Sequence, residues 1–433
     1  MGEGGGALLT LGRMERKRSS PVVTLLPSDP MRLACKVGVL TTALASAVGL
    51  AACGTASGAS GTAPPTTQQV VQASSAPSSS QSAPGQSSRP GRGNRTHKGT
   101  PAARATRTSG AAMTPRTGGG AASPPALAVS TAHPDHVIGH GTPASCTSQA
   151  VVRAVAAGGV ITFSCGPRPV TIVMRATAKV RNTSARVVLD GGGKVTLSGG
   201  GVRRILYMDT CDPAQTWTTS HCQDQSSPVL IVQAMTFADG NSTGQLFDGG
   251  GGGAIFDRGG QLKVVDSHFT GNRCEASGPD LGGAAIRVLS QYQNRPVYVV
   301  RSTFRGGVCS NGGALSSIGV SWVIQDSTMS GNRAIGRGAN PAQAGTPGGG
   351  SGGAIYTDGN RYTVTIDGTV ITGNSATEGG GAVFFVSNDR TGTLRIEHSR
   401  LRGNPNAGFH TAGYPGVFFL GRGTPLVISS TLS

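Results

Sequence analysis

A two-part motif recurs along the second half of the chain and limits what the chain can fold into. Each unit opens with two glycines, a small residue and an aliphatic one, and closes on an apolar-x-Gly-Asn tetrad or a close variant. The five complete units begin at Gly252, Gly282, Gly312, Gly352 and Gly380, and they close at Asn272, Gly307, Asn332, Asn374 and Asn404. An incomplete copy ends at Asn241. Repetition at a period of about 20 to 50 residues predicts a solenoid.

The residues inside each unit favour strands over helices. Short runs such as Leu262/Val264 and Val364/Ile366 alternate apolar and polar positions and are bounded by Gly, Asn, Asp and Ser. No unit is apolar at i, i+3, i+4 and i+7, which excludes a helical solenoid. Two or three short strands per unit predict an all-β fold, a parallel β-helix whose equivalent strands stack at about 4.8 Å.

The paired motifs resemble the GGAI and FxxN repeats of polymorphic outer-membrane proteins. The resemblance covers about residues 144–433 and implies a right-handed, pectate-lyase-like parallel β-helix. It implies no single activity, because this fold carries lyases, hydrolases and adhesins alike.

Two further features of the solenoid follow from the residues. Ser148 to Ala157 is apolar on one face and stops at two glycines, which predicts a short helix that caps the first coil. Asn272, Asn332, Asn374 and Asn404 share one turn position, and we expect their side-chain amides to hydrogen-bond from coil to coil.

The N-terminal part predicts export. Met31, Arg32 and Lys36 precede an apolar run, 37–48, that is too short to span a bilayer. Leu50-Ala51-Ala52-Cys53 resembles the lipobox of bacterial lipoproteins, which implies that residues 31–53 are a signal and that Cys53 is acylated. An ordinary signal peptide is the alternative. Residues 1–30 are interpreted as an upstream over-extension of the reading frame. We therefore expect a membrane-anchored lipoprotein on the extracytoplasmic face or cell surface.

Residues 54–130 predict a disordered tether. They are rich in Ser, Pro, Gly and Arg, with too few aliphatic residues to offset the entropy of ordering the chain. Part of the net charge of +17 lies here, in cations between residues 89 and 116 that have no acid nearby. This charge favours anionic lipids or wall polymers as partners. Nucleic acid is not expected, because no aromatic residue interleaves with these arginines.

Six cysteines remain after Cys35 and Cys53 are set aside, and an even number in an exported chain predicts disulfides. Cys274 and Cys309 hold the same position in adjacent coils, at a separation that a disulfide allows. Cys211 and Cys222 are expected to close a loop, and Cys146 and Cys165 to join the capping helix to the first strand. A metal site is the alternative for one group of residues: Asp209, Cys211, His221, Cys222 and Asp224.

Catalytic residues are harder to find. The resemblance implies carboxylates that hold calcium and an Arg or Lys base in a lyase, or two or three Asp in a hydrolase. Seven aspartates precede Gly or Ser, where turn chemistry explains them: Asp190, Asp239, Asp248, Asp266, Asp326, Asp358 and Asp367. Asp257 and Asp358, which follow opening strands, are the best candidates for a catalytic acid. Arg287 is the best candidate for a catalytic base. Apart from calcium in a lyase, no cofactor is expected.

One row of residues suggests a binding surface. If the aliphatic residue of each opening motif points inward, alternation sends the next residue outward. This row consists of Phe256, Arg287, Ser316, Tyr356 and Phe384. Exposed, it would suit stacking on sugar rings and pairing with carboxylates. If a loop such as 336–350 covers it, the aromatic residues are ordinary packing.

The leading hypothesis is an exported, lipid-anchored β-helix that presents an elongated surface to a polysaccharide or another envelope polymer. A polysaccharide lyase or glycoside hydrolase of the same fold is the first alternative. A structural adhesin or spacer that acts through protein contacts is the second.

Overall fold

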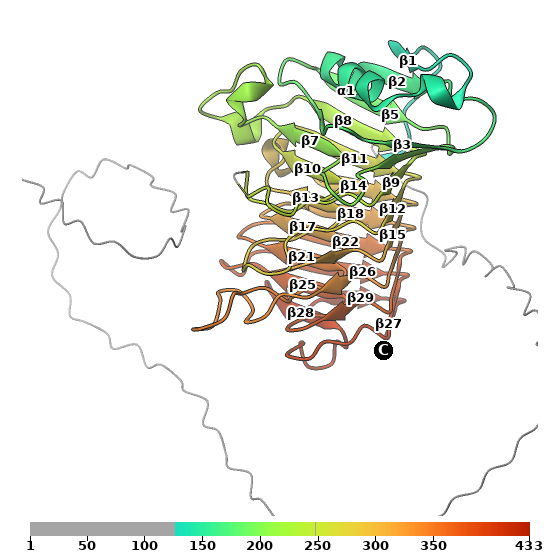
Figure 1. The fold of residues 1–433 in the computed structure, drawn as a ribbon. Coiled ribbons are helices and arrows are strands. Elements are labelled where there is room, and N and C mark those ends of the chain that lie inside the picture. The colour runs from blue at the N-terminus through green and yellow to red at the C-terminus, as the bar shows by residue number, and fades with distance from the viewer. Residues whose placement is uncertain (1–125, 247) are drawn as a thin grey trace, which may run out of the picture. The chain divides into compact units, whose positions relative to one another are not determined.

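The computed structural model describes residues 126–246 and 248–433, and these residues form one stack of coils (Figure 1). Every strand pairing between named strands is parallel, and the strands lie in four sheets that run along the stack. Most coils contribute one strand to each of three long sheets, and three coils add a strand to a short fourth sheet. The prediction of an all-β, parallel β-helix solenoid is confirmed.

Sheet A has ten strands and sheet B has nine. In stacking order, sheet A comprises β1 (His136–Ile138), β2 (Gly159–Phe163), β5 (Arg186–Asp190), β8 (Val229–Gln233), β11 (Gln261–Val265), β14 (Val297–Val300), β18 (Trp322–Gln325), β22 (Thr363–Asp367), β26 (Thr393–Glu397) and β29 (Leu426–Ile428). Sheet B comprises β3 (Val170–Val173), β6 (Val195–Ser198), β9 (Thr236–Ala238), β12 (His268–Thr270), β15 (Thr303–Arg305), β19 (Thr328–Ser330), β23 (Val370–Thr372), β27 (Arg400–Arg402) and β30 (Thr431–Leu432).

Sheet C has eight strands and sheet D three. Sheet C comprises β4 (Ala178–Lys179), β7 (Leu206–Asp209), β10 (Ile255–Arg258), β13 (Ile286–Val288), β17 (Leu315–Ile318), β21 (Ile355–Asp358), β25 (Val383–Val386) and β28 (Val417–Leu420). Sheet D comprises β16 (Val308–Cys309), β20 (Arg333–Ala334) and β24 (Ser375–Ala376). Short 3-10 turns at Pro143–Ser145, Pro213–Gln215, Cys222–Asp224 and Tyr292–Asn294 lie in the connections.

The core is a set of ladders in which one inward position of every coil is filled by an apolar side chain. In sheet C, Ile255 pairs with Ile286, and the ladder continues through buried aliphatic residues to Val417. In sheet B, the rings of Phe237, Phe269 and Phe304 stack with centroids 5.1 and 4.7 Å apart. Alternation within each strand places these side chains inside and the intervening residues outside.

A ladder of asparagines stabilises the corner after sheet B, as predicted. The amide of Asn332 donates to that of Asn374 (2.8 Å), and Asn374 donates to Asn404 (2.9 Å). The glycine before each ladder asparagine has a φ between +59° and +63°, a conformation that costs other residues more. The ladder is interrupted in the coil where Gly307 takes the asparagine position; there the Gly307 amide donates to Asn332 (2.9 Å).

The three predicted disulfides are confirmed. Cys274 and Cys309 join neighbouring coils with their Cα atoms 4.8 Å apart. Cys211–Cys222 closes a loop after β7, and Cys146–Cys165 joins the segment before the capping helix to the end of the first coil.

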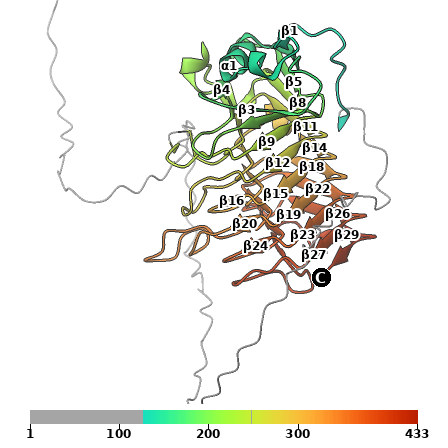
Figure 2. The ribbon, with the colours of Figure 1, turned by 45° about the vertical axis from the view of Figure 1, so that its right-hand side comes forward.

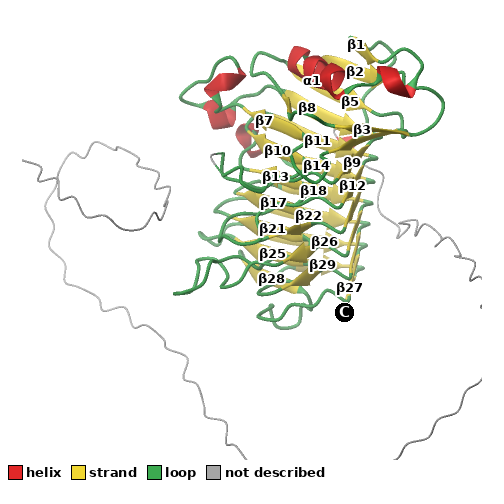
Figure 3. Cartoon of the chain, in the orientation of Figure 1, coloured by secondary structure: helices red, strands yellow, loops and turns green. Residues whose placement is uncertain are grey.

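The capping helix α1 (Ser148–Ala157) has the predicted bounds and lies over the N-terminal end of the stack (Figure 3). Thr147 caps it by accepting a hydrogen bond from the Ala150 amide (3.2 Å). Val151 and Val155 are fully buried in the core beneath the helix. The helix therefore covers a strand edge and an apolar interior that the first coil alone would expose.

Residues 126–135 form a strap on the outer face of sheet A. Ala126 is buried against Val265 and Val300, strands β11 and β14. Val129 exchanges two hydrogen bonds of 3.0 Å with the side chain of Gln233 in β8. The strap then reaches Asp190 through Thr131 and ends beside β2. The chain thus enters the solenoid from the side, several coils away from the cap.

Predicted features upstream of the strap, including the signal and Cys53, lie outside the described residues. Within residues 126–246 and 248–433, no helix has the length and apolar character needed to span a bilayer.

Candidate functional site

The row of residues from Phe256 to Phe384, predicted to be exposed, does form one continuous row across sheet C, but it is buried. Its five residues pair successively across sheet C, as the repeat predicted. Phe256, Ser316 and Tyr356 are fully buried, and Arg287 and Phe384 are 2% and 3% exposed. The prediction of an exposed row is therefore wrong. The residues point away from the main core, as alternation requires, but other segments cover them.

Three contacts show what covers the row. The Arg204 guanidinium lies over the ring of Phe256, 4.7 Å from its centroid. Asn340, in the 336–350 loop, donates to the Tyr356 hydroxyl (2.8 Å). Phe409 meets Phe384 edge-on at 6.3 Å. A second layer of side chains thus packs outside sheet C, and the alternative of a covering loop applies at Tyr356.

Asp257 faces the opposite way from the row and is buried on the interior side of β10. Gln291 donates to one of its carboxyl oxygens (2.5 Å), while the other has no hydrogen-bond partner among the described residues. Burial raises the pKa of Asp257 well above its usual range. Because the side chain is fully buried, it is not placed to meet a polymer at the surface.

The fold brings together three of the predicted site residues, Arg287, Tyr356 and Asp358. Asp280 and Asn340 join them, and we call the group of Tyr356, Asp358, Asp280 and Asn340 the tyrosine–aspartate cluster. Asn340 donates to the carboxylates of Asp280 (2.6 Å) and Asp358 (3.0 Å) as well as to the Tyr356 hydroxyl. The hydroxyl also contacts Asp358 (3.2 Å). Burial, and then the nearby charge of Asp280, raise the pKa of Asp358 against the hydrogen bonds it accepts.

The chemistry of this tyrosine–aspartate cluster is that of two carboxylates around one hydroxyl, a set suited to proton transfer. Its space, however, is filled by the Asn340 amide, which bonds to all three groups. Arg287 supports the cluster from below by donating to the backbone oxygen of Asp280 and to the Ser316 hydroxyl. In this arrangement the cluster fastens the 336–350 loop to sheet C.

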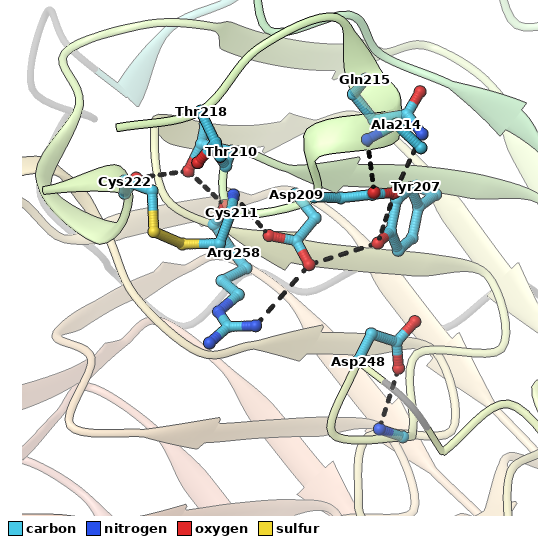
Figure 4. A network of polar contacts seen from close by, with 12 residues as sticks. Tyr207, Asp209, Thr210, Cys211, Ala214, Gln215, Thr218, Cys222, Asp248 and Arg258 are labelled. Atoms are coloured by element: carbon cyan, nitrogen blue, oxygen red, sulfur yellow. Dashed lines mark hydrogen bonds and ion pairs between the residues drawn. A yellow bond between two sulfur atoms is a disulfide. The ribbon is translucent and has the colours of Figure 1, made fainter. Parts of the chain in front are cut away.

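A similar cluster lies in the same register near the N-terminal end (Figure 4). The Tyr207 hydroxyl is 3.2 Å from both Asp209 and Asp212. Asp209 faces Arg258 at 3.8 Å, and burial raises the pKa of its carboxyl. Burial opposes ionisation of Asp212 too, but hydrogen bonds from Gln215 and Ala214 outweigh it and lower the pKa of Asp212.

The structure does not support the alternative of a metal site around Cys211 and Cys222. Cys211 and Cys222 are joined to each other, so neither offers a thiolate, and Asp209 accepts a hydrogen bond from the Cys211 amide (2.8 Å). Asp224 accepts from the backbone of Gln293 (2.6 Å). Nearby, Arg204 and Asp248 form a buried ion pair (2.5 Å), which no sequence pattern predicts.

The surface that sequence reasoning missed is the outer face of sheet B, whose strands stack in one column (Figure 2). Two outward rows flank the apolar core row. The first consists of Thr171, Thr196, Thr236, His268, Thr303, Thr328, Val370, Arg400 and Thr431. The second consists of Val173, Ser198, Ala238, Thr270, Arg305, Ser330, Thr372 and Arg402. We call these rows the threonine–arginine face.

Charge on the threonine–arginine face has one sign. Neither row contains an acidic residue. Arg305, Arg400 and Arg402 are exposed and make no ion pair or side-chain hydrogen bond within the described part of the chain. The signal that could have revealed this face is the polar-apolar-polar pattern before most closing glycines, as in Thr303-Phe304-Arg305 and Thr328-Met329-Ser330.

Comparisons with known proteins found no matching family model, no similar curated protein and no similar solved structure.

Proposed function

We propose that the protein is exported, lipid-anchored through Cys53, and binds an anionic polysaccharide or a similar anionic polymer of the cell envelope along its threonine–arginine face. The observation that carries the proposal is the pair of outward rows on sheet B, which are rich in hydroxyls, carry unpaired arginines and contain no acid. The lipobox resemblance and the three disulfides support the exported location.

The spacing of the face suits an extended polymer. Neighbouring strands place equivalent side chains about 4.8 Å apart along the axis, while alternate residues within a strand lie about 6.7 Å apart. Hydroxyls on this grid can exchange hydrogen bonds with sugar hydroxyls. Arg305 and Arg402 hold one register three strands apart, about 14 Å, and each can pair with a carboxylate or phosphate on the same polymer.

The test measures retention of the purified protein on acidic, neutral and basic polysaccharides at increasing salt. Acidic polymers are expected to retain it, and retention should fall with salt because the contacts are between exposed charges. The double variant Arg305→Gln/Arg402→Gln should lose most of this retention. Arg186→Gln, which removes an exposed arginine from sheet A, is the matched control.

Equal retention of the double variant and the control would contradict the proposal. Each polymer is also assayed for new reducing ends and unsaturated products after incubation. Turnover that survives Arg305→Gln/Arg402→Gln but not Asp358→Asn would favour the enzymatic alternative at the tyrosine–aspartate cluster.

A further inference from the structure

A cavity of about 410 Å³ opens on the outer face of sheet A, within the range of about 300 to 1,000 Å³ typical of small-molecule sites. Apolar side chains form most of its wall, and two cations lie at its edge. The residues that matter are Val229, Ile231, Pro296, Tyr298, Lys263 and Arg295. No carboxylate is among the residues that line it.

Lys263 is out of place in its row. It occupies an outward position of sheet A that apolar residues fill in the neighbouring coils. These are Val160, Val188, Ile231, Tyr298 and Val323; farther along the same row come Thr365 and Arg395. A residue that breaks a local pattern often marks a functional site.

The charge of Lys263 is poorly compensated. Its ammonium group donates to the backbone oxygen of Leu127 in the strap (2.7 Å) and has no acidic partner within the described residues. Burial lowers the pKa of Lys263, as expected for a cation taken partly out of water without a counter-ion. Arg295 donates a long bond to the Gln261 side chain (3.3 Å) and lies over the ring of Tyr292.

We propose that this cavity binds a small amphipathic anion, a single carboxylate or sulfonate group carried on an apolar ring. The anionic group lies between Lys263 and Arg295 and supplies the missing counter-charge. The ring packs on the partly exposed side chains of Val229 and Tyr298 and removes their carbon from water. The site lies on sheet A and does not depend on what the threonine–arginine face binds.

Isothermal titration of the intact protein with 2-naphthoate tests the proposal, with 2-naphthamide as the uncharged probe of the same shape. Naphthoate is expected to bind at one site per chain and more tightly than the amide. Lys263→Met keeps the aliphatic stem and removes the charge, so the Kd should rise about tenfold. Arg295→Gln, at an exposed position, should weaken binding in the same direction.

Two further variants test whether naphthoate binds in this cavity. Val229→Trp fills the cavity and should abolish binding of both probes. Lys194→Met, which removes an exposed lysine elsewhere, should leave the Kd unchanged. Unchanged naphthoate affinity in Lys263→Met and Arg295→Gln, equal affinity for the amide, or binding that persists in Val229→Trp would each overturn the proposal. Absence of saturable naphthoate binding would overturn it as well.

Discussion

The side-chain amide of Asn374 donates a hydrogen bond to the side-chain oxygen of Asn404, 2.9 Å away in the next coil. Its own side-chain oxygen accepts two hydrogen bonds from Asn332 in the coil before. This one buried side chain therefore connects three coils. Its partners have no access to water, because all three asparagines are nearly or fully buried.

Asn374→Ala should lower the free energy of unfolding by about 3 kcal/mol, since it leaves several buried polar groups unpaired at about 1 to 3 kcal/mol each. Urea denaturation followed by circular dichroism measures the loss. Asn360→Ala, at an exposed asparagine whose side chain makes no hydrogen bond to the described residues, is the control and should cost little. A similar loss in both variants would argue against the ladder as a source of stability.

The Cys274–Cys309 bridge encloses 35 residues of sequence separation. Replacing both cysteines by alanine should lower stability by about 3 to 4 kcal/mol, the loop-closure entropy for a loop of this size. Thiol titration of the unfolded, unreduced wild type should find none of the six bridged cysteines free. Detection of free thiols at Cys274 or Cys309 by mass mapping would refute the bridge.

Asp257 should make stability depend on pH. Its pKa is raised in the folded state, so its contribution is full below the ordinary carboxyl pKa of about 4 and is lost as pH rises through the folded value. Asp257→Asn should remove this loss and be more stable than wild type at neutral and alkaline pH. Urea midpoints between pH 4 and 9 test this. Asp239→Asn, at an exposed turn, should keep the wild-type slope; an Asp257→Asn slope equal to it would contradict the assignment.

Tyr356→Phe removes the hydroxyl that Asn340 and Asp358 share. We expect a loss of about 1 to 2 kcal/mol and faster hydrogen exchange in the 336–350 loop, because this contact holds the loop on sheet C. Exchange mass spectrometry of loop peptides gives the readout. Tyr292→Phe, a tyrosine of another connection, should leave loop exchange unchanged. Unaltered loop protection in Tyr356→Phe would show that other contacts hold it.

Gln233→Ala should release the strap. The Gln233 amide both donates to and accepts from the backbone of Val129, so its loss exposes the strap amides. Limited proteolysis should cut residues 126–135 faster, with the coils themselves unaffected. Equal cleavage in wild type and variant would mean that the remaining contacts, such as the packing of Ala126 and the Lys263–Leu127 hydrogen bond, hold the strap.

The repeat made most of the fold predictable. Coil register and the Cys274–Cys309 pairing follow from residues that recur at equivalent positions, so one coil constrains the next. The capping helix followed from its own apolar face and the two glycines that end it. The exposure of the Phe256 row did not follow, because alternation decides which side of a strand a residue takes but not what packs on that side. Its covering residues, Arg204, Asn340 and Phe409, lie outside the repeated motif.

The candidate sites were less predictable for the same reason. Tyr356 was expected in the outward row and Asp358 just after the same opening strand. Asp280 and Asn340, however, come from irregular connections whose paths no periodicity describes. The threonine–arginine face was in principle readable, since its residues alternate regularly around the phenylalanine ladder. The lysine of the sheet A cavity could have been found as a charge in an apolar row.

Because the strap runs along the wall of the solenoid, a pull on the chain upstream of Ala126 arrives midway along the stack. Such a load would peel Ala126, then Leu127, then Val129 from the sheet one contact after another before it reached the capped coil. The strap would therefore detach before the coils, because only a few contacts hold it, whereas parallel strand pairing joins each coil to its neighbours.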